Sequence, residues 1–224
     1  MTTITTTDVA AAPEPPPDCP LCPRLVAFRH ENAALYPAFH NAPVPSWVGE
    51  EGRERVRLLV VGMAPGLKGA NRTGRPFTGD YAGDLLFATL KKHGFASGTY
   101  RAEPDDGMVL HDCAITNAVR CVPPQNKPTG PEANSCRPFL RATLATMPAL
   151  RVAVTLGKIA HDSFLRGLGE RVAAHPFGHD REHATEGLTV VSSYHCSRYN
   201  TNTGVLTPQM FDAVFARVRR LLDG

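Results

Sequence analysis

The strongest constraint on this fold is an apolar run that ends in a long loop of glycine and polar residues. Residues 56–61 are mostly apolar, and residues 62–80 then read GMAPGLKGANRTGRPFTGD. A second apolar run, residues 188–192, leads into HCSRYNTNTG at 195–204. Open α/β sheets bind ligands in the crevice where parallel strands end in such loops. The two loops therefore predict a ligand pocket at one edge of a parallel sheet.

Alternating strand and helix patterns predict an α/β fold with a single domain. We expect strands at residues 55–62, 111–119, 151–157 and 188–193, and helices at 80–93, 131–147, 158–167 and 207–222. This order is typical of a parallel β-sheet flanked by helices on both faces. The stretches 97–110 and 168–187 are expected to be surface connections.

Composition narrows the class of protein further. The chain has 224 residues and is 42% hydrophobic, enough for one core. Its net charge is only +3, so any nucleic-acid contact must come from a local patch. Residues 1–17 are rich in Thr, Ala and Pro, which predicts a disordered tail before a folded domain at 18–224. No apolar run approaches the ~20 residues of a membrane span, so a cytoplasmic location is expected.

Four of the six cysteines are spaced like ligands of a metal or a cluster. They are Cys19, Cys22, Cys121 and Cys136. The first two form a C-x2-C pair beside prolines, and the other two flank a second proline-rich stretch. Such a set can bind zinc or an iron–sulfur cluster, and the spacing does not separate the two. The alternative is a role in the core, because free cysteines are often buried. That packing role is our interpretation of Cys113 and Cys196.

Three strings of this sequence resemble the motifs of family five, or type B, uracil-DNA glycosylases of bacteria and archaea. They are GMAPGLKGANRTGRPFTGD, ITNAVRCVPPQNKP and HCSRYNTNTGVLT. The resemblance extends from Cys19 to the last predicted helix and implies the uracil-DNA-glycosylase-like fold. It also implies a [4Fe–4S] cluster, rather than zinc, on Cys19, Cys22, Cys121 and Cys136.

The same resemblance implies an activity. Enzymes of this family flip uracil out of double-stranded DNA and hydrolyse its glycosidic bond, which begins base excision repair. Hypoxanthine and xanthine are expected as further substrates. We expect a monomer that works at the nucleoid, with a cluster that is structural.

The resemblance assigns four residues to substrate binding, namely Gly62, Ala64, Phe77 and Asn117. Phe77 is expected to stack under the base, and the alternative is that it fills the core. The amide of Asn117 offers both a donor and an acceptor for the edge of uracil. The alternative for Asn117 is a turn cap.

Asp80 and His195 are the predicted catalytic residues. Asp80 can orient water or offset positive charge on the sugar, and the alternative is a plain helix N-cap. His195 can donate to the O2 oxygen of the departing base, a contribution of order 3 kcal/mol per donor. The alternative for His195 is a structural role. Position 63 is Met where better-known glycosylases have a polar residue, which leaves Asp80 as the candidate for directing water.

The predicted DNA contacts come from the same two loops. They are Arg72, Arg75, Ser197, Arg198, Tyr199, Asn200 and Asn202. Arg198 is suited to phosphate or the minor groove, and Tyr199 is suited to wedge a base step. Further candidate phosphate contacts are Lys68, Arg120 and Lys127, although most surface cations are only solvated.

Three histidines at a spacing of four residues suggest a metal site, but Pro176 and Gly178 argue against a continuous helix there. They are His175, His179 and His183, and we expect a surface loop instead.

Two other functions remain open at this stage. A non-catalytic iron–sulfur protein that binds damaged DNA would keep the cysteines and the NTNTG loop. The presence of Asp80, Asn117 and His195 favours the enzyme over it. A redox carrier would leave those pocket residues without a purpose.

Overall fold

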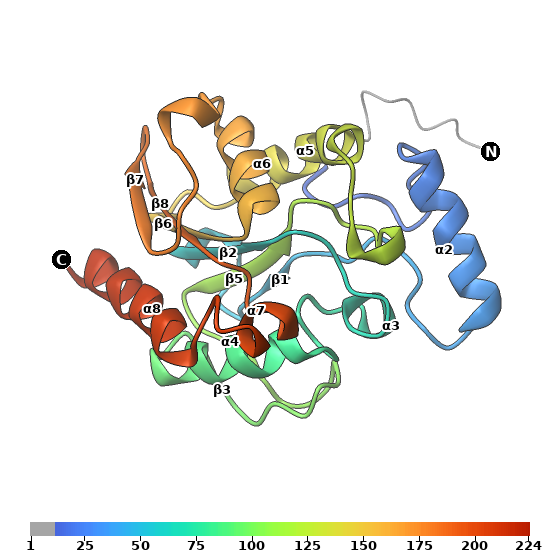
Figure 1. Ribbon diagram of the computed structural model, residues 1–224, viewed down its shortest axis with the longest axis horizontal. Helices are drawn as coiled ribbons and strands as arrows, with labels where there is room; N and C mark the ends of the chain where they lie inside the picture. The colour runs from blue at the N-terminus through green and yellow to red at the C-terminus, as the bar shows by residue number, and fades with distance from the viewer. Residues whose placement is uncertain (1–11) are drawn as a thin grey trace.

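The computed structural model describes residues 12–224, and its centre is a six-stranded sheet with helices on both faces (Figure 1). Across the sheet, the strands are β1 (Trp47–Val48), β5 (Cys113–Asn117), β2 (Leu58–Gly62), β6 (Val152–Leu156), β8 (Thr189–Ser193) and β7 (Arg181–Ala184). The four inner strands are parallel, and the two edge strands are antiparallel to their neighbours. The inner strands are buried on both faces, which explains their nearly continuous apolar sequences. The predicted α/β fold is confirmed.

Two helices cover each face of the sheet (Figure 1). On one face lie α5 (Gly130–Ala145) and α6 (Lys158–Leu168), which pack with Leu59 and Val61. On the other face lie α4 (Tyr81–Lys92) and α8 (Pro208–Asp223), which pack with Leu58 and Val60. Side chains alternate between the faces of a strand, so one short apolar run supplies both cores.

Local hydrogen bonds fix where the helices begin. Asp80 accepts from the N–H of Ala82 at 3.1 Å and caps α4, while Thr207 accepts from Met210 at 3.1 Å and caps α8. Such side chains satisfy donors that the first helical turn leaves unpaired. The predicted starts of these two helices, at residues 80 and 207, are therefore confirmed.

Several elements were not predicted. They are α2 (Pro23–Leu35), α3 (Ala70–Thr73), α7 (Arg198–Asn202), the pair β3 (Ala96–Ser97) and β4 (Val109–Leu110), the edge strands β1 and β7, and the 3-10 turns η1 (Arg53–Arg55), η2 (Pro124–Asn126) and η3 (Val172–Ala174). The predicted surface connections 97–110 and 168–187 thus hold short elements of their own. No helix within residues 12–224 is both long and apolar enough to span a membrane.

The segment before α2 differs from the expected disordered tail. Residues 1–11 lie outside the described residues, but 12–17 are packed against the domain. Glu14 forms ion pairs with Arg120 at 2.5 Å and Arg53 at 2.7 Å, and the carbonyl of Pro13 accepts from Thr143 at 2.7 Å. Arg120 is only 1% exposed, so its expected contact with DNA phosphate is wrong. A buried guanidinium needs a nearby carboxylate, and Glu14 supplies it.

We expect the Glu14→Ala substitution to lower the free energy of unfolding by about 3 kcal/mol, because Arg120 would remain buried without its carboxylate. Burial raises the pKa of Glu14, but Arg120, Arg53 and Ser46 outweigh it and hold the pKa below its usual value. The stabilisation is therefore present above about pH 4 and is lost as the pH falls through the folded pKa. Urea unfolding of Glu14→Ala and of the exposed control Glu31→Ala measures it; equal stability of both variants would contradict it.

Candidate active site and cysteine site

Five of the predicted site residues line one small cavity at the carboxyl ends of the parallel strands. They are Ala64, Phe77, Asp80, Asn117 and His195. Gly62 ends β2 and pairs with Asn117, which ends β5, while His195 follows β8. The cavity shares part of its lining with a wider groove bordered by Lys68, Lys158 and Arg198. Residues far apart in the sequence therefore meet at the crevice that strand order predicts.

Gly62 is essential to this arrangement because of space. A Cβ atom at Gly62 would lie 2.4 Å from Oδ1 of Asn117 and 2.6 Å from Cζ of Phe77. Phe77 itself is 6% exposed and packs at the edge of the core, so it both fills the core and forms a cavity wall. Its ring stacks on His195 with a centroid distance of 5.8 Å. The lack of a side chain at Gly62 therefore leaves the space that Asn117 and Phe77 occupy at the pocket floor.

Asp80 caps a helix and also lines the cavity. Oδ1 caps α4, while Oδ2 lies so close to the glycine loop that a Cβ at Gly69 would approach it to 2.4 Å. Burial raises the pKa of Asp80, and the backbone N–H groups of Gly83 and Ala82 oppose that rise. A carboxylate with a raised pKa is a better proton acceptor, and the cavity keeps it near any bound molecule.

His195 is held as a neutral imidazole. Burial lowers its pKa to about 4. The side chain of Asn200 donates to the carbonyl oxygen of His195 at 2.8 Å, which ties the strand end to the following loop. A neutral imidazole keeps one N–H donor without carrying a positive charge.

The loop predicted to contact DNA contains a short helix, α7, capped by Ser197. Asn200 is turned inward to His195, whereas Arg198, Tyr199 and Asn202 are exposed. Tyr199 is 73% exposed. The guanidinium of Arg198 lies 5.2 Å above the ring of Tyr81 at the border of the groove.

Two arginines expected to contact phosphate form ion pairs within the protein instead. Arg75 is 7% exposed, forms an ion pair with Asp106 at 2.9 Å and lies 4.3 Å above the ring of Trp47. Burial makes the predicted DNA contact of Arg75 wrong. Arg72 donates to the carboxylate of Glu103 at 2.9 Å and to a backbone carbonyl. Both arginines hold the loop in shape.

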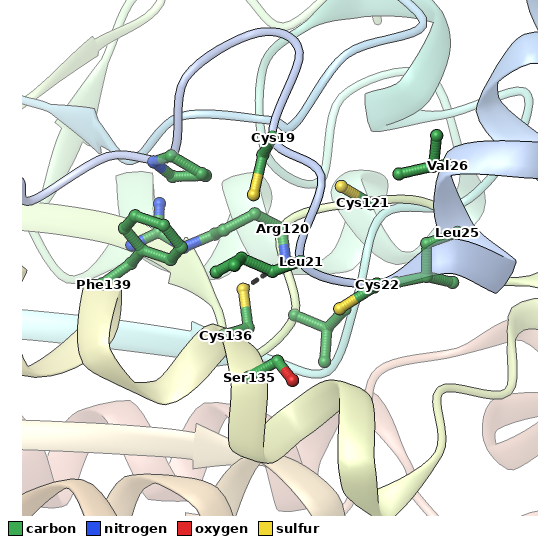
Figure 2. A pocket seen from close by; sticks show the side chains of 12 residues that line it. Cys19, Leu21, Cys22, Leu25, Val26, Arg120, Cys121, Ser135, Cys136 and Phe139 are labelled. Atoms are coloured by element: carbon green, nitrogen blue, oxygen red, sulfur yellow. Dashed lines mark hydrogen bonds between the residues drawn. The ribbon is translucent and has the colours of Figure 1, made fainter. Parts of the chain in front are cut away.

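The four cysteines face one apolar cavity on the side of the molecule that carries α2 (Figures 1 and 2). Cys19 and Cys22 precede α2, Cys121 follows β5, and Cys136 lies on α5. None of the four forms a disulfide bond within residues 12–224. The backbone N–H of Arg120 donates to the sulfur of Cys136 at 3.3 Å, as the dashed line in Figure 2 marks.

Burial favours the protonated thiol in this cavity, and nearby arginines oppose that effect. Burial raises the pKa of Cys121 to about 11 and that of Cys136 to about 12. Arg29 donates to the sulfur of Cys121 at 3.7 Å, as a group that stabilises thiolate would. Within residues 12–224, no three His, Cys, Asp or Glu side chains form a site for a single metal ion. The four cysteines line one cavity.

The other two cysteines are buried, and the three histidines lie on or just before the edge strand β7. Cys113 and Cys196 are at most 1% exposed, which confirms their packing roles. His183 lies on β7, with the ring of His175 at a centroid distance of 5.5 Å. His179 stacks on Tyr194 at 5.1 Å. His183 therefore lies on a strand, whereas His175 and His179 lie in the loop before it, as expected.

Comparison with known proteins identifies the family. The Uracil DNA glycosylase superfamily matches residues 50–219. A type-5 uracil-DNA glycosylase of Thermus thermophilus is 42% identical over 209 residues, which cover 91% of this chain and 93% of that protein. Type-5 enzymes of Mycobacterium bovis and Pyrobaculum aerophilum are 39% and 38% identical, over 91% and 89% of this chain and 78% and 87% of theirs. The chain therefore belongs to the uracil DNA glycosylase superfamily and, within it, to the type-5 uracil-DNA glycosylases.

We expect the imidazole of His195 to remain neutral between about pH 5.5 and pH 8, because burial lowers its pKa to about 4. Nitrogen-edited NMR of the ring, assigned by comparison with His195→Gln, measures its titration. A midpoint above pH 6 would mean that the imidazole is mostly protonated at pH 5.5 and would contradict the prediction.

Proposed function

We propose that this protein hydrolyses the N-glycosidic bond of uracil in double-stranded DNA and so initiates base excision repair. Family membership supports a DNA-repair glycosylase, a hydrolase acting on N-glycosyl bonds. The observation that carries the proposal is the meeting of Phe77, Asn117, Asp80 and His195 around one cavity. A base enters such a cavity only after it leaves the helical stack, which costs a few kcal/mol.

Two residues recognise the flipped base in this proposal. The ring of Phe77 forms an apolar wall on which the base stacks, and the amide of Asn117 pairs with its polar edge. Because Gly62 leaves no space to spare, Asn117 and Phe77 have one fixed separation. A rigid pocket orients the glycosidic bond before chemistry begins.

Two further residues act on the charges of the reaction. When the bond between the sugar C1′ and the base nitrogen breaks, its electron pair goes to the base and positive charge develops on the sugar. The N–H of His195 donates to the O2 oxygen where the negative charge gathers. The carboxylate of Asp80 offsets the positive charge and orients the water that attacks C1′.

The mouth of the groove supplies the DNA contacts. The exposed cations Lys68 and Arg198 border it and are suited to the flanking phosphates. Tyr199 stands exposed on α7 and is suited to fill the gap that the flipped base leaves. Action as a monomer at the nucleoid is part of this proposal.

A broader substrate range is part of the proposal. Met63 and Ala64 give the groove beside the cavity an apolar border, and the groove is far wider than the cavity itself. This space supports the entry of larger deaminated bases, namely hypoxanthine and xanthine.

We further propose that the four cysteines hold a [4Fe–4S] cluster. Zinc requires four ligand atoms at about 2.3 Å from one point, whereas each cysteine of a four-iron cluster binds a different iron. Sulfurs arranged around a cavity, with N–H donors from Arg120 and Arg29, fit the cluster. Bound there, it acts as a cross-link between the segment before α2, the loop after β5, and α5.

We expect the Asp80→Asn enzyme to lose at least about 100-fold in activity while remaining folded, because the ionised carboxylate is gone. Labelled duplexes with one uracil, hypoxanthine or xanthine are treated with alkali, which breaks the strand where a base is missing. Asp84→Asn, one turn along α4 and exposed, is the matched control.

The same assay tests the proposed function itself. Product from the uracil duplex with wild-type protein supports the glycosylase. Tight binding of damaged DNA without product on any duplex would instead favour the non-catalytic damage-binding protein. Near-normal cleavage by Asp80→Asn would remove Asp80 from its assigned role.

We expect purified protein to contain about four irons and four sulfides per chain, and Cys136→Ser to lose them together with much of its solubility. Metal analysis and visible absorbance measure this without any reference to activity. Cys113→Ser, outside the cavity, is the control and should retain the iron. Stoichiometric zinc in wild-type protein would contradict the cluster.

A further inference from the structure

The floor of the pocket is a turn in a costly backbone conformation. Phe77 has φ of +56° and Gly79 has φ of +95°. For a residue with a side chain, the left-handed region costs of order 1–3 kcal/mol and persists only where the surroundings enforce it. The structure must therefore contain a group that holds the turn from 77 to 79.

That group is the hydroxyl of Tyr100, which comes from the stretch expected to be a mere surface connection. It accepts from the N–H of Gly79 at 3.2 Å and donates to the carbonyl oxygen of Phe77 at 3.4 Å. One oxygen thus bridges both ends of the turn. The ring of Tyr100 packs on Phe87, with a centroid distance of 4.6 Å.

The site around the hydroxyl is closely fitted. A Cβ atom on Gly83 would lie 2.4 Å from the Tyr100 oxygen and 2.0 Å from the Phe77 carbonyl oxygen. Burial raises the pKa of Tyr100, so the phenol keeps the proton that it donates.

A second anchor ties the same turn to the same stretch. Arg75 donates to the hydroxyl of Thr78 at 2.8 Å and to the carboxylate of Asp106 at 2.9 Å. The carboxylate of Asp106 also accepts from the backbone N–H groups of Arg101 and Met108. Residues 100–108 therefore act as a template against which the turn is formed.

We propose that Tyr100 is a positioning residue, whose hydroxyl fixes the ring of Phe77 as the platform for the flipped base. This inference rests on the proposed glycosylase activity. Tyr100 lines neither the cavity nor the groove, so it acts through the turn and not through the substrate.

The test is Tyr100→Phe, which removes one oxygen and keeps the ring. Tyr36→Phe removes the same oxygen at a position outside the pocket and serves as the control. We expect faster hydrogen exchange of the Gly79 amide in Tyr100→Phe alone. We also expect its single-turnover rate on uracil duplex at saturating enzyme to fall about tenfold, with unchanged binding of undamaged duplex and only a small decrease in the urea midpoint.

Each outcome decides the inference. Unchanged exchange at Gly79 overturns it, whatever the activity. Faster exchange with a normal single-turnover rate also overturns it, because the turn would then be held without benefit to the reaction. A wild-type protein inactive on uracil removes the proposed function, whereas an active wild type with an unaffected Tyr100→Phe removes this inference alone.

Discussion

The parallel pairing of β2 with β5 is the constraint on which both sites depend. Its register places Gly62 opposite Asn117, so the two strands end together at one edge of the sheet. The chain then leaves β2 through the loop that carries Phe77 and Asp80, and leaves β5 toward Cys121. A shift of one residue would turn Asn117 to the other face of the sheet and open the pocket. Burial of both strands on both faces makes such a shift costly.

The cysteine site and the pocket share this strand end and brace it from opposite sides. Only three residues separate Asn117 from Cys121, and between them Arg120 points into the protein. Its backbone N–H reaches the sulfur of Cys136, while its guanidinium reaches Glu14 at the front of the described chain. Asn117, the residue proposed to recognise the base, is therefore attached to a segment held by several contacts, which suits a pocket that must be rigid before a base arrives.

Local sequence signals predicted the inner strands and the capped helices, because strand ends and caps depend on neighbouring residues. The pocket residues were assigned by the resemblance to a known family. The predictions that were wrong or missing concern features that no local pattern specifies. Arg75 and Arg120 read as surface cations, yet their partners Asp106 and Glu14 lie 31 and 106 residues away, and no local pattern pairs them. Helix α2 buries Leu25, Arg29 and Asn32, a mixed set without an apolar stripe. The sequence did not indicate a role for Tyr100, because its hydrogen bonds depend on the backbone turn at residues 77–79.

Burial shifts the pKa values of the pocket's two titratable groups in opposite directions, and these shifts match the charges of the proposed reaction. The same loss of water raises the pKa of Asp80 and lowers that of His195. The N–H groups of Gly83 and Ala82 favour the charged form of Asp80, whereas His195 remains neutral. The pocket thus offers a carboxylate to a sugar that becomes positive and an uncharged donor to a base that becomes negative. A cationic His195 beside Phe77 would weaken this separation of charges. It would also attract the carboxylate of Asp80, which is proposed to offset the positive charge of the sugar.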